Sequence, residues 1–204
     1  MAPTPHAHNQ RTVAGYERSA REYAASVAST PSPPGEAALR QLAASVAPGG
    51  RVLEIGSGPG WDADFLESLG LDVHRTDAAV AFCDFQAERG KRCDRLDLLA
   101  DRIDGRYDGI AMLAVLQHFE RAQLDAALRK LALALDAGGA LLLMYPEGDD
   151  DDWEHGDSGD YRMVRWTPEA MDARLAQAGF AVAWQHTFDG RAGSWRSVLA
   201  RRQA

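Results

Sequence analysis

The stretch Val52-Leu53-Glu54-Ile55-Gly56-Ser57-Gly58-Pro59-Gly60 decides the fold, because an apolar run passes directly into a turn that holds three glycines. The run from Arg51 to Ile55 predicts a strand, and a helix is predicted after the turn, over Asp62 to Leu69. Glycines in such a turn let the backbone approach a ligand without a Cβ clash. The pattern therefore indicates a βαβ unit with a ligand at the carboxyl end of its first strand.

Strands and helices alternate on both sides of this unit. Further strands are predicted at 71–76, 92–96, 107–113 and 140–144, with helices at 80–89 and 124–135. Two last strands, at 180–187 and 195–201, form a hairpin, which adds an antiparallel strand to a parallel sheet. We expect one α/β domain over 13–204, beginning with two helices over 13–48, and a disordered segment over 1–12.

Composition and charge exclude several classes of protein. The 204 residues are 46% hydrophobic and 25% charged, as in one globular domain. No segment has the length and apolarity of a membrane span, and no signal peptide is evident, so we expect a cytoplasmic protein without a membrane partner. Two cysteines predict neither a disulfide framework nor a metal site. Outside Glu147 to Asp160 the acids balance the bases, which argues against a nucleic-acid partner.

The glycine spacing argues against a dinucleotide site. A dinucleotide fingerprint would place its third glycine at position 61, where Trp61 stands and would crowd a pyrophosphate. Glu54, directly before the turn, would repel phosphate and favours a cationic ligand. Asp77 ends the second predicted strand, where a carboxylate either accepts hydrogen bonds from ribose hydroxyls or caps the next helix. An NAD oxidoreductase is therefore the disfavoured alternative.

Together these motifs resemble the class I S-adenosylmethionine-dependent methyltransferases, over nearly the whole chain. Residues 52–60 look like the first motif of the family, and Asp77 and Asp97 fall on its ribose-binding and adenine-binding acids. Residues 107–119 are similar to the strand-four motif of small-molecule members, and 137–143 to the turn and strand that follow. The resemblance implies a doubly wound, mostly parallel, seven-stranded Rossmann-like sheet with one antiparallel strand near the C-terminus. It also implies S-adenosylmethionine as cofactor and S-adenosylhomocysteine as product.

The resemblance carries over to individual residues. Glu54 and Gly56 would hold the methionine end of the cofactor, and Ala78 and Leu98 would flank the adenine. Tyr16 and Tyr23 lie on a helix similar to the one that covers the cofactor, with simple core packing as the alternative. The cofactor-binding residues expected in this way are Tyr16, Tyr23, Glu54, Gly56, Ser57, Gly58, Gly60, Asp77, Ala78, Asp97, Leu98 and Leu113.

Methyl transfer is an in-line displacement, so the enzyme must mainly hold a nucleophile in place and exclude water. His118 follows the fourth predicted strand at the edge where ligands bind such sheets, which makes it a candidate base or substrate-positioning residue. A structural histidine that caps the next helix is the alternative. Residues 113–116 lack the Asn/Asp-Pro-Pro-aromatic sequence of amino-methylating DNA enzymes, and neither cysteine has the context of a base-methylating nucleophile.

These exclusions leave a small molecule or a peptide as substrate. Residues 145–166 are the segment in which this family varies its substrate lid, and here the segment is acidic. Its acids would attract an amine-bearing substrate, and the aromatic lid residues are Tyr145, Trp153, Tyr161 and Trp166. A mobile, solvated loop is the alternative. We expect methyl transfer to O or N of a small metabolite, natural product or peptide, with a catalytically silent S-adenosylmethionine-binding partner or sensor protein as the alternative.

Overall fold

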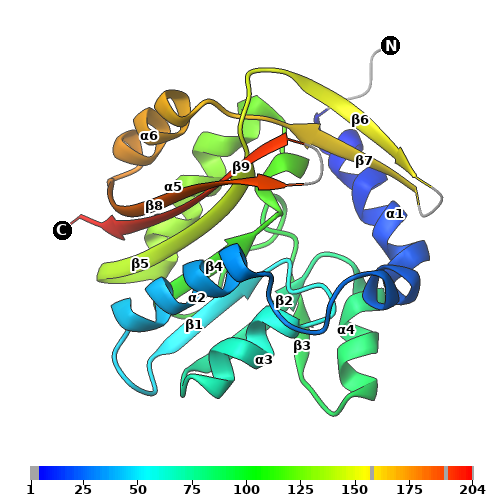
Figure 1. Cartoon of the computed structure of the whole chain (residues 1–204), viewed down its shortest axis with the longest axis horizontal. Helices are drawn as coiled ribbons and strands as arrows, with labels where there is room; N and C mark the ends of the chain where they lie inside the picture. The colour runs from blue at the N-terminus through cyan, green and yellow to red at the C-terminus, as the bar shows by residue number, and fades with distance from the viewer. Residues whose placement is uncertain (1–4, 157–158, 191–192, 204) are drawn as a thin grey trace.

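The computed structural model describes residues 5–156, 159–190 and 193–203 (Figure 1). The strands are β1 (Arg51–Ile55), β2 (Asp72–Asp77), β3 (Cys93–Arg95), β4 (Tyr107–Leu113), β5 (Leu135–Pro146), β6 (Asp151–Gly156), β7 (Gly159–Val164), β8 (Phe180–Gly190) and β9 (Gly193–Arg202). The helices are α1 (Pro5–Ser26), α2 (Pro33–Ser45), α3 (Trp61–Ser68), α4 (Val80–Glu88), α5 (Leu124–Ala134) and α6 (Pro168–Gln177), with short 3-10 helices η1 (Leu116–His118) and η2 (Arg121–Gln123).

Seven of the strands form one sheet in the order β3-β2-β1-β4-β5-β9-β8. Strands β1 to β5 are parallel to their neighbours, whereas β9 runs antiparallel to both β5 and β8. The mostly parallel, seven-stranded sheet with an antiparallel strand near the C-terminus is therefore confirmed. The strand order reverses between β1 and β4, so their carboxyl ends diverge and leave room for a ligand.

Helices cover both faces of the sheet (Figure 1). Alternate residues of β1 and β5 point to opposite faces, so Val52 and Leu142 pack with α2 and α3 while Leu53 and Leu141 pack with α5 and α6. Both faces are apolar because both are buried, which explains the continuous apolar runs of the sequence. Within the described residues, no helix is both long and apolar enough to cross a membrane.

Helix α1 begins at Pro5, so the expectation of a disordered segment over 1–12 is wrong for residues 5–12; residues 1–4 lie outside the described part. Contacts with distant elements hold this first part of the helix. Asn9 donates to the His118 carbonyl at 2.6 Å and accepts from Gln123 at 2.7 Å, and Thr12 accepts from the Arg162 amide at 3.1 Å. These partners lie more than 100 residues away, so local sequence could not reveal the helix.

The acidic segment forms an antiparallel hairpin of β6 and β7 rather than a loop. Asp151 pairs with Val164 at one end and Gly156 with Gly159 at the other. Figure 1 shows the hairpin lying beside α1, at the edge of the molecule away from α3. The segment expected to act as a lid thus has a regular structure of its own and a defined neighbour.

Candidate functional site

The glycine turn, residues 56–60, joins β1 to α3 and has positive φ at all three of its glycines, Gly56, Gly58 and Gly60. Gly58 has φ +53°, and no other atom lies within 4 Å of the place that a Cβ would take, so this side of the turn is open. Gly60 has φ +87°, and a Cβ there would lie 2.6 Å from Gln86 Oε1 and 2.8 Å from Arg75 Nη1. The turn therefore combines an open front with a tightly packed back.

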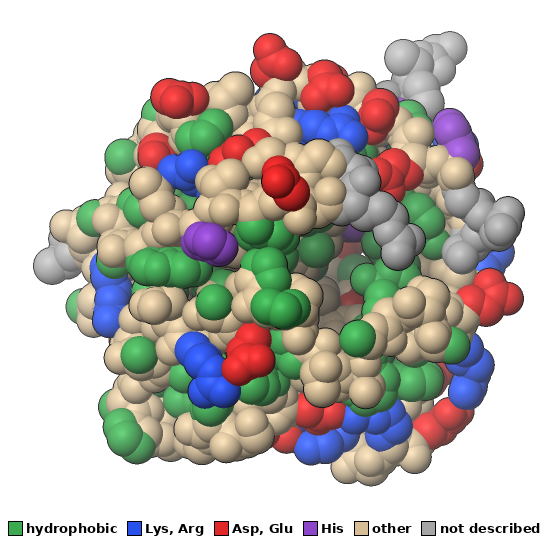
Figure 2. Space-filling model, viewed as in Figure 1, with side chains coloured by type: hydrophobic (Ala, Val, Ile, Leu, Met, Phe, Trp, Pro, Cys, Tyr) green, Lys and Arg blue, Asp and Glu red, His purple; other side chains and the backbone are tan. Residues whose placement is uncertain are grey.

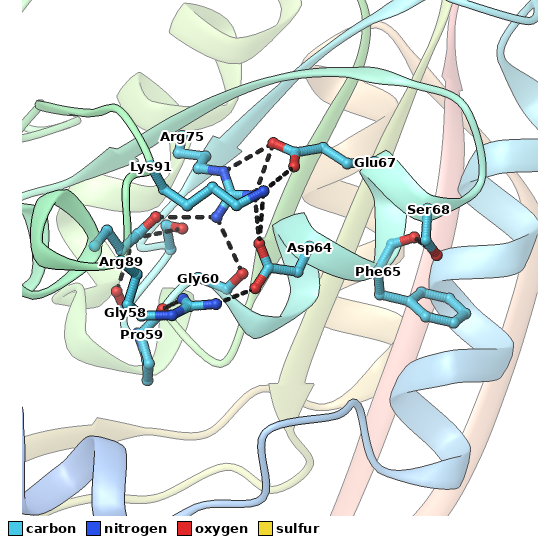
Figure 3. Close-up of polar contacts among 12 residues, drawn as sticks. Gly58, Pro59, Gly60, Asp64, Phe65, Glu67, Ser68, Arg75, Arg89 and Lys91 are labelled. Carbon is cyan, nitrogen blue, oxygen red and sulfur yellow. Dashed lines mark hydrogen bonds and ion pairs between the residues drawn. The ribbon is translucent and has the colours of Figure 1, made fainter.

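Side chains from β2 and α4 hold the back of the turn (Figure 3). The guanidinium of Arg75, which is 2% exposed, donates to the Gly60 carbonyl at 3.3 Å and to Asp64 at 2.6 Å. Arg89 donates to the Pro59 carbonyl at 2.6 Å. Gln86 donates to the Gly58 carbonyl at 2.9 Å. Because three successive carbonyls are fixed from behind, the turn presents a preorganised backbone to a ligand in front.

In front of the turn, a first cavity lies between α1, α4 and the loop after β3. Its lining residues are Asn9, Thr12, Val13, Tyr16, Tyr23, Ile55, Gly56, Gly58, Asp77, Ala78, Ala79, Phe82, Leu96, Asp97, Leu98, Leu99, Leu113, Ala114, Val115, His118 and Phe119. Most of these side chains are apolar, and two carboxylates, from Asp77 and Asp97, are placed among them. A concave apolar site with a few convergent polar groups is typical of a small-molecule site.

The carboxylate of Asp77 is held rigidly at the end of β2. One oxygen accepts from the Gly58 amide at 2.8 Å and the other from the Ala79 amide at 2.8 Å. Burial raises the pKa of Asp77 to about 6, and these two amides oppose the rise. Each oxygen keeps a further lone pair for a ligand, so the carboxylate can accept from two hydroxyls. Asp97 is fixed more loosely, through its bond to the Leu99 amide at 2.9 Å.

A second cavity adjoins the first across the turn. It is lined by Tyr23, Val27, Ala28, Thr30, Pro31, Ser32, Pro33, Gly35, Gly56, Ser57, Gly58, Pro59, Trp61, Asp62, Leu113, Ala114 and Met144. Five residues line both cavities, namely Tyr23, Gly56, Gly58, Leu113 and Ala114. Figure 2 shows a hollow on this face of the molecule with hydrophobic side chains around it. One ligand can therefore extend from the first cavity over the turn into the second.

His118 lies at the base of the first cavity with both ring nitrogens engaged. Nδ1 donates to the Arg162 carbonyl at 2.7 Å, because a carbonyl can only accept, and Nε2 then accepts from the Tyr16 hydroxyl at 3.1 Å. Burial lowers the pKa of His118 to about 4, so the ring is neutral at pH 7. The Tyr16 ring also packs against Tyr161 of β7, with 4.5 Å between ring centroids. His118 and Tyr16 thus connect η1, α1 and the hairpin.

Arginines from within the acidic segment and from distant elements pair with its carboxylates. Arg162, which is buried, bonds to Asp151 and to Glu120, the latter at 2.7 Å. Arg165 contacts Asp150 at 3.3 Å and Asp152 at 3.5 Å. Two further acids are paired in the same way, Asp160 with Arg11 and Glu147 with Arg196. The hairpin therefore has much less free negative charge than the sequence indicates.

The structure does not bring the four aromatic lid residues to the cavities. Tyr145 is fully buried in the sheet, and Trp166 is buried with Arg121 and Arg174 over its ring. Trp153 packs against His8 and Arg11 on the outside of the hairpin. Tyr161 comes nearest, through its contact with Tyr16, but lines neither cavity. The ring faces of Trp153 and Trp166, expected to bind a cationic substrate, are occupied by arginines of the chain itself.

Of the expected cofactor residues, all but two line one or both cavities. Gly60 and Glu54 are the two that do not, because both lie behind the turn, where Glu54 is 4% exposed. Sequence reasoning missed Asn9 and Thr12, whose segment was expected to be disordered. It also missed Asp62, although an acid two residues beyond the last turn glycine is a visible signal.

Among the described residues, no group of three His, Cys, Asp or Glu side chains is arranged to hold a metal ion.

Comparison with known proteins agrees with this geometry. Residues 35–185 match the family described as the methyltransferase domain. No curated protein matches the sequence. Among solved structures, the chain resembles the 1,6-didemethyltoxoflavin-N1-methyltransferase of Burkholderia thailandensis, bound to 1,6-didemethyltoxoflavin and S-adenosylhomocysteine, at 17% identity and a TM-score of 0.77, with 100% of this chain and 92% of that chain covered.

Two further solved structures have the same fold. DhpI in complex with S-adenosylhomocysteine is 21% identical with a TM-score of 0.75, over 98% of this chain and 99% of that chain. The glycopeptide N-methyltransferase MtfA, complexed with sinefungin, is 17% identical with a TM-score of 0.66, over 83% and 87% of the two chains. The fold, the two cavities and the family match place the chain in the methyltransferase domain family.

The protein is an S-adenosylmethionine-dependent methyltransferase. The residues of the site fit that cofactor. The doubly anchored carboxylate of Asp77 suits a ribose, and the apolar pocket beside Asp97 suits an adenine. The open front of Gly58 and the second cavity leave room for the methionine end.

Proposed function

We propose that this methyltransferase acts on an oxygen or nitrogen atom of a small metabolite, natural product or peptide. The observation that carries the proposal is the second cavity, which meets the first at the turn and at Leu113 and Ala114. An acceptor that enters through it reaches the carboxyl ends of β1 and β4, where the cofactor residues converge. Solved relatives that are named as N-methyltransferases of 1,6-didemethyltoxoflavin and of a glycopeptide support this class of acceptor.

The lining of the second cavity favours an acceptor with an apolar body. Val27, Pro31, Leu113 and Met144 contribute apolar walls, and Asp62 is the one charged side chain among the described residues that line it. Asp150, Asp151 and Asp152 are paired with arginines, and no described acid of the hairpin lines either cavity. We therefore assign recognition of the acceptor to these apolar walls rather than to the acidic segment.

The bound cofactor supplies a sulfonium methyl group as electrophile. The chain contributes position and exclusion of water, because α1 and the hairpin cover the first cavity through Tyr16 and Tyr161. Ala114 lies at the junction of both cavities with φ +54°, a backbone region that alanine rarely adopts. Its amide donates to the Met144 carbonyl at 3.1 Å and its carbonyl accepts from Gln117 at 2.6 Å, which holds the strained backbone.

We assign His118 a positioning role rather than the role of base. Its lowered pKa and its two occupied nitrogens make it a poor proton acceptor at neutral pH. It orients the Tyr16 hydroxyl and ties α1 to β7, both of which cover the cofactor residues. The acceptor would then react as a neutral amine or lose its proton to water.

A screen of acceptors tests the proposed function. Amine, phenol, carboxylate and thiol compounds, each in a polar and an apolar form, are incubated with the enzyme and S-adenosylmethionine. Release of S-adenosylhomocysteine is measured, and the methylated product is identified by mass spectrometry. We expect turnover with apolar amines or phenols. Turnover confined to thiols, or to strongly anionic acceptors, would contradict the proposal.

A further inference from the structure

Asp62 lies where the helix that follows the turn begins, in the wall of the second cavity. It is the second residue of α3, directly after the turn glycine Gly60 and Trp61. A carboxylate in the first turn of a helix is stabilised by the helix dipole, which accounts for part of its placement. The dipole does not explain why this side chain faces a cavity instead of solvent.

The carboxylate of Asp62 has no hydrogen bond or ion pair with any of the described residues, which makes it unusual among the acids near the turn. Asp64, two residues further along the same helix, bonds to Arg75 at 2.6 Å and to Arg89. Glu67 of that helix bonds to Arg75 at 3.0 Å. The cations behind the turn are therefore already paired with other acids, and Asp62 faces the cavity unpaired.

A second carboxyl group, that of Glu54, lies close enough to Asp62 for mutual repulsion, and a hydrogen bond with Ser57 and attraction by Arg75 only partly offset its desolvation. Glu54 is 4% exposed, and its Oε2 atom has no hydrogen-bond partner among the described residues. Burial, with repulsion from Asp62 as the next cause, raises the pKa of Glu54 to about 8, and burial raises the pKa of Asp62 to about 6. Desolvation of Glu54 and Asp62 disfavours their ionised forms, and a carboxyl group perturbed in this way in a cleft, as Asp62 is, is typical of a ligand site.

The cofactor brings the missing cation. Its adenosine end finds polar partners in the first cavity, and Gly58, which donates to Asp77, also lines the second cavity. A ligand anchored at Asp77 that continues across Gly58 therefore reaches Asp62. The methionine end of S-adenosylmethionine carries an ammonium group, which needs up to three acceptors and binds a carboxylate strongly.

We propose that Asp62, rather than the buried Glu54, is the direct partner of the methionine ammonium group of the cofactor. The proposal rests on the S-adenosylmethionine dependence of the enzyme. Glu54 lines neither cavity, and with a pKa raised to about 8 it is largely protonated and neutral at pH 7. Asp62 is thus the cofactor-binding residue of the pair, and Glu54 is not a direct partner of the ammonium group.

Isothermal titration calorimetry of two ligands tests this role. S-adenosylhomocysteine carries the ammonium group, whereas 5′-methylthioadenosine shares the adenosine and the thioether but lacks the amino-acid end. Asp62→Asn should weaken S-adenosylhomocysteine binding by about 10- to 100-fold, the range for a lost charge-assisted hydrogen bond. Its affinity for 5′-methylthioadenosine should stay within about twofold of wild type. Asp84→Asn, at an exposed position of α4, is the matched control and should change neither affinity.

The outcomes separate the possible explanations. Unchanged S-adenosylhomocysteine binding by Asp62→Asn would overturn the proposal and would assign Asp62 to the acceptor or to the helix terminus. An equal loss of affinity for both ligands would also overturn the proposal, because the variant would then have disturbed the adenosine site or the fold. Failure of the wild-type protein to bind S-adenosylhomocysteine at all would instead refute the cofactor assignment itself.

Discussion

Replacement of Glu54 by glutamine should flatten the pH dependence of stability near neutrality. Burial, aided by repulsion from Asp62, raises the pKa of Glu54 from 4.5 to about 8. Between about pH 6.5 and 8 the unfolded chain has lost this proton whereas most of the folded protein still holds it. The folded state therefore binds more protons, and the free energy of unfolding of the wild type falls as the pH rises.

The size of the fall follows from the two pKa values. One pKa unit corresponds to about 1.4 kcal/mol, and the folded protein holds on average most of one extra proton over this window. The contribution of Glu54 to the free energy of unfolding should therefore fall by about 1.5 to 2 kcal/mol between about pH 6.5 and 8. Glu54→Gln keeps the shape of the side chain without the titration, so its curve should lack this component.

Urea unfolding followed by tryptophan fluorescence measures the difference. The free energy of unfolding is determined at several pH values for wild type, Glu54→Gln and the control Glu22→Gln, whose side chain is exposed on α1. The advantage of Glu54→Gln over wild type should grow with pH, and the control should follow wild type. A constant difference between Glu54→Gln and wild type across the window would refute the reasoning and show that Glu54 is ionised throughout.

Four other predictions concern the site and the hairpin. Asp77→Ala should weaken S-adenosylhomocysteine binding by about 100-fold in calorimetry, because it removes a charged acceptor from the ligand and from the amides of Gly58 and Ala79; an affinity within about threefold of wild type would contradict this. Wild-type affinity should also fall as the pH is lowered through about 6, where Asp77 takes up a proton. His118→Gln should keep kcat within about tenfold of wild type, whereas a loss of about 100-fold or more with a changed pH profile would make His118 the base. Arg162→Met should lower the free energy of unfolding by about 2 kcal/mol, because it leaves Asp151 unpaired and Glu120 with His8 alone; unchanged urea midpoints would show that these ion pairs do not stabilise the hairpin.

The sequence by itself determined the central part of the fold. Strands over 51–55 and 107–113 were predicted with the bounds that the structure has, because buried parallel strands are mostly apolar runs that the sequence shows directly. The same local logic located the turn at Gly56 to Gly60 and the acid at Asp77, since both follow directly from the ends of strands. Motifs of this kind are contiguous, so they can be read without knowledge of distant contacts.

Only the tertiary structure shows which elements cover the site and which of its charged groups are paired. The helix over residues 5–12 depends on contacts with η1, η2 and β7, and carboxylates of the hairpin pair with its own Arg162 and with the distant Arg11. Whether a carboxylate is free or paired is a matter of which cation lies beside it in space. The sequence shows Asp62 and Asp64 as equivalent acids of one helix, yet Asp64 is neutralised by Arg75 and Asp62 is left facing a cavity.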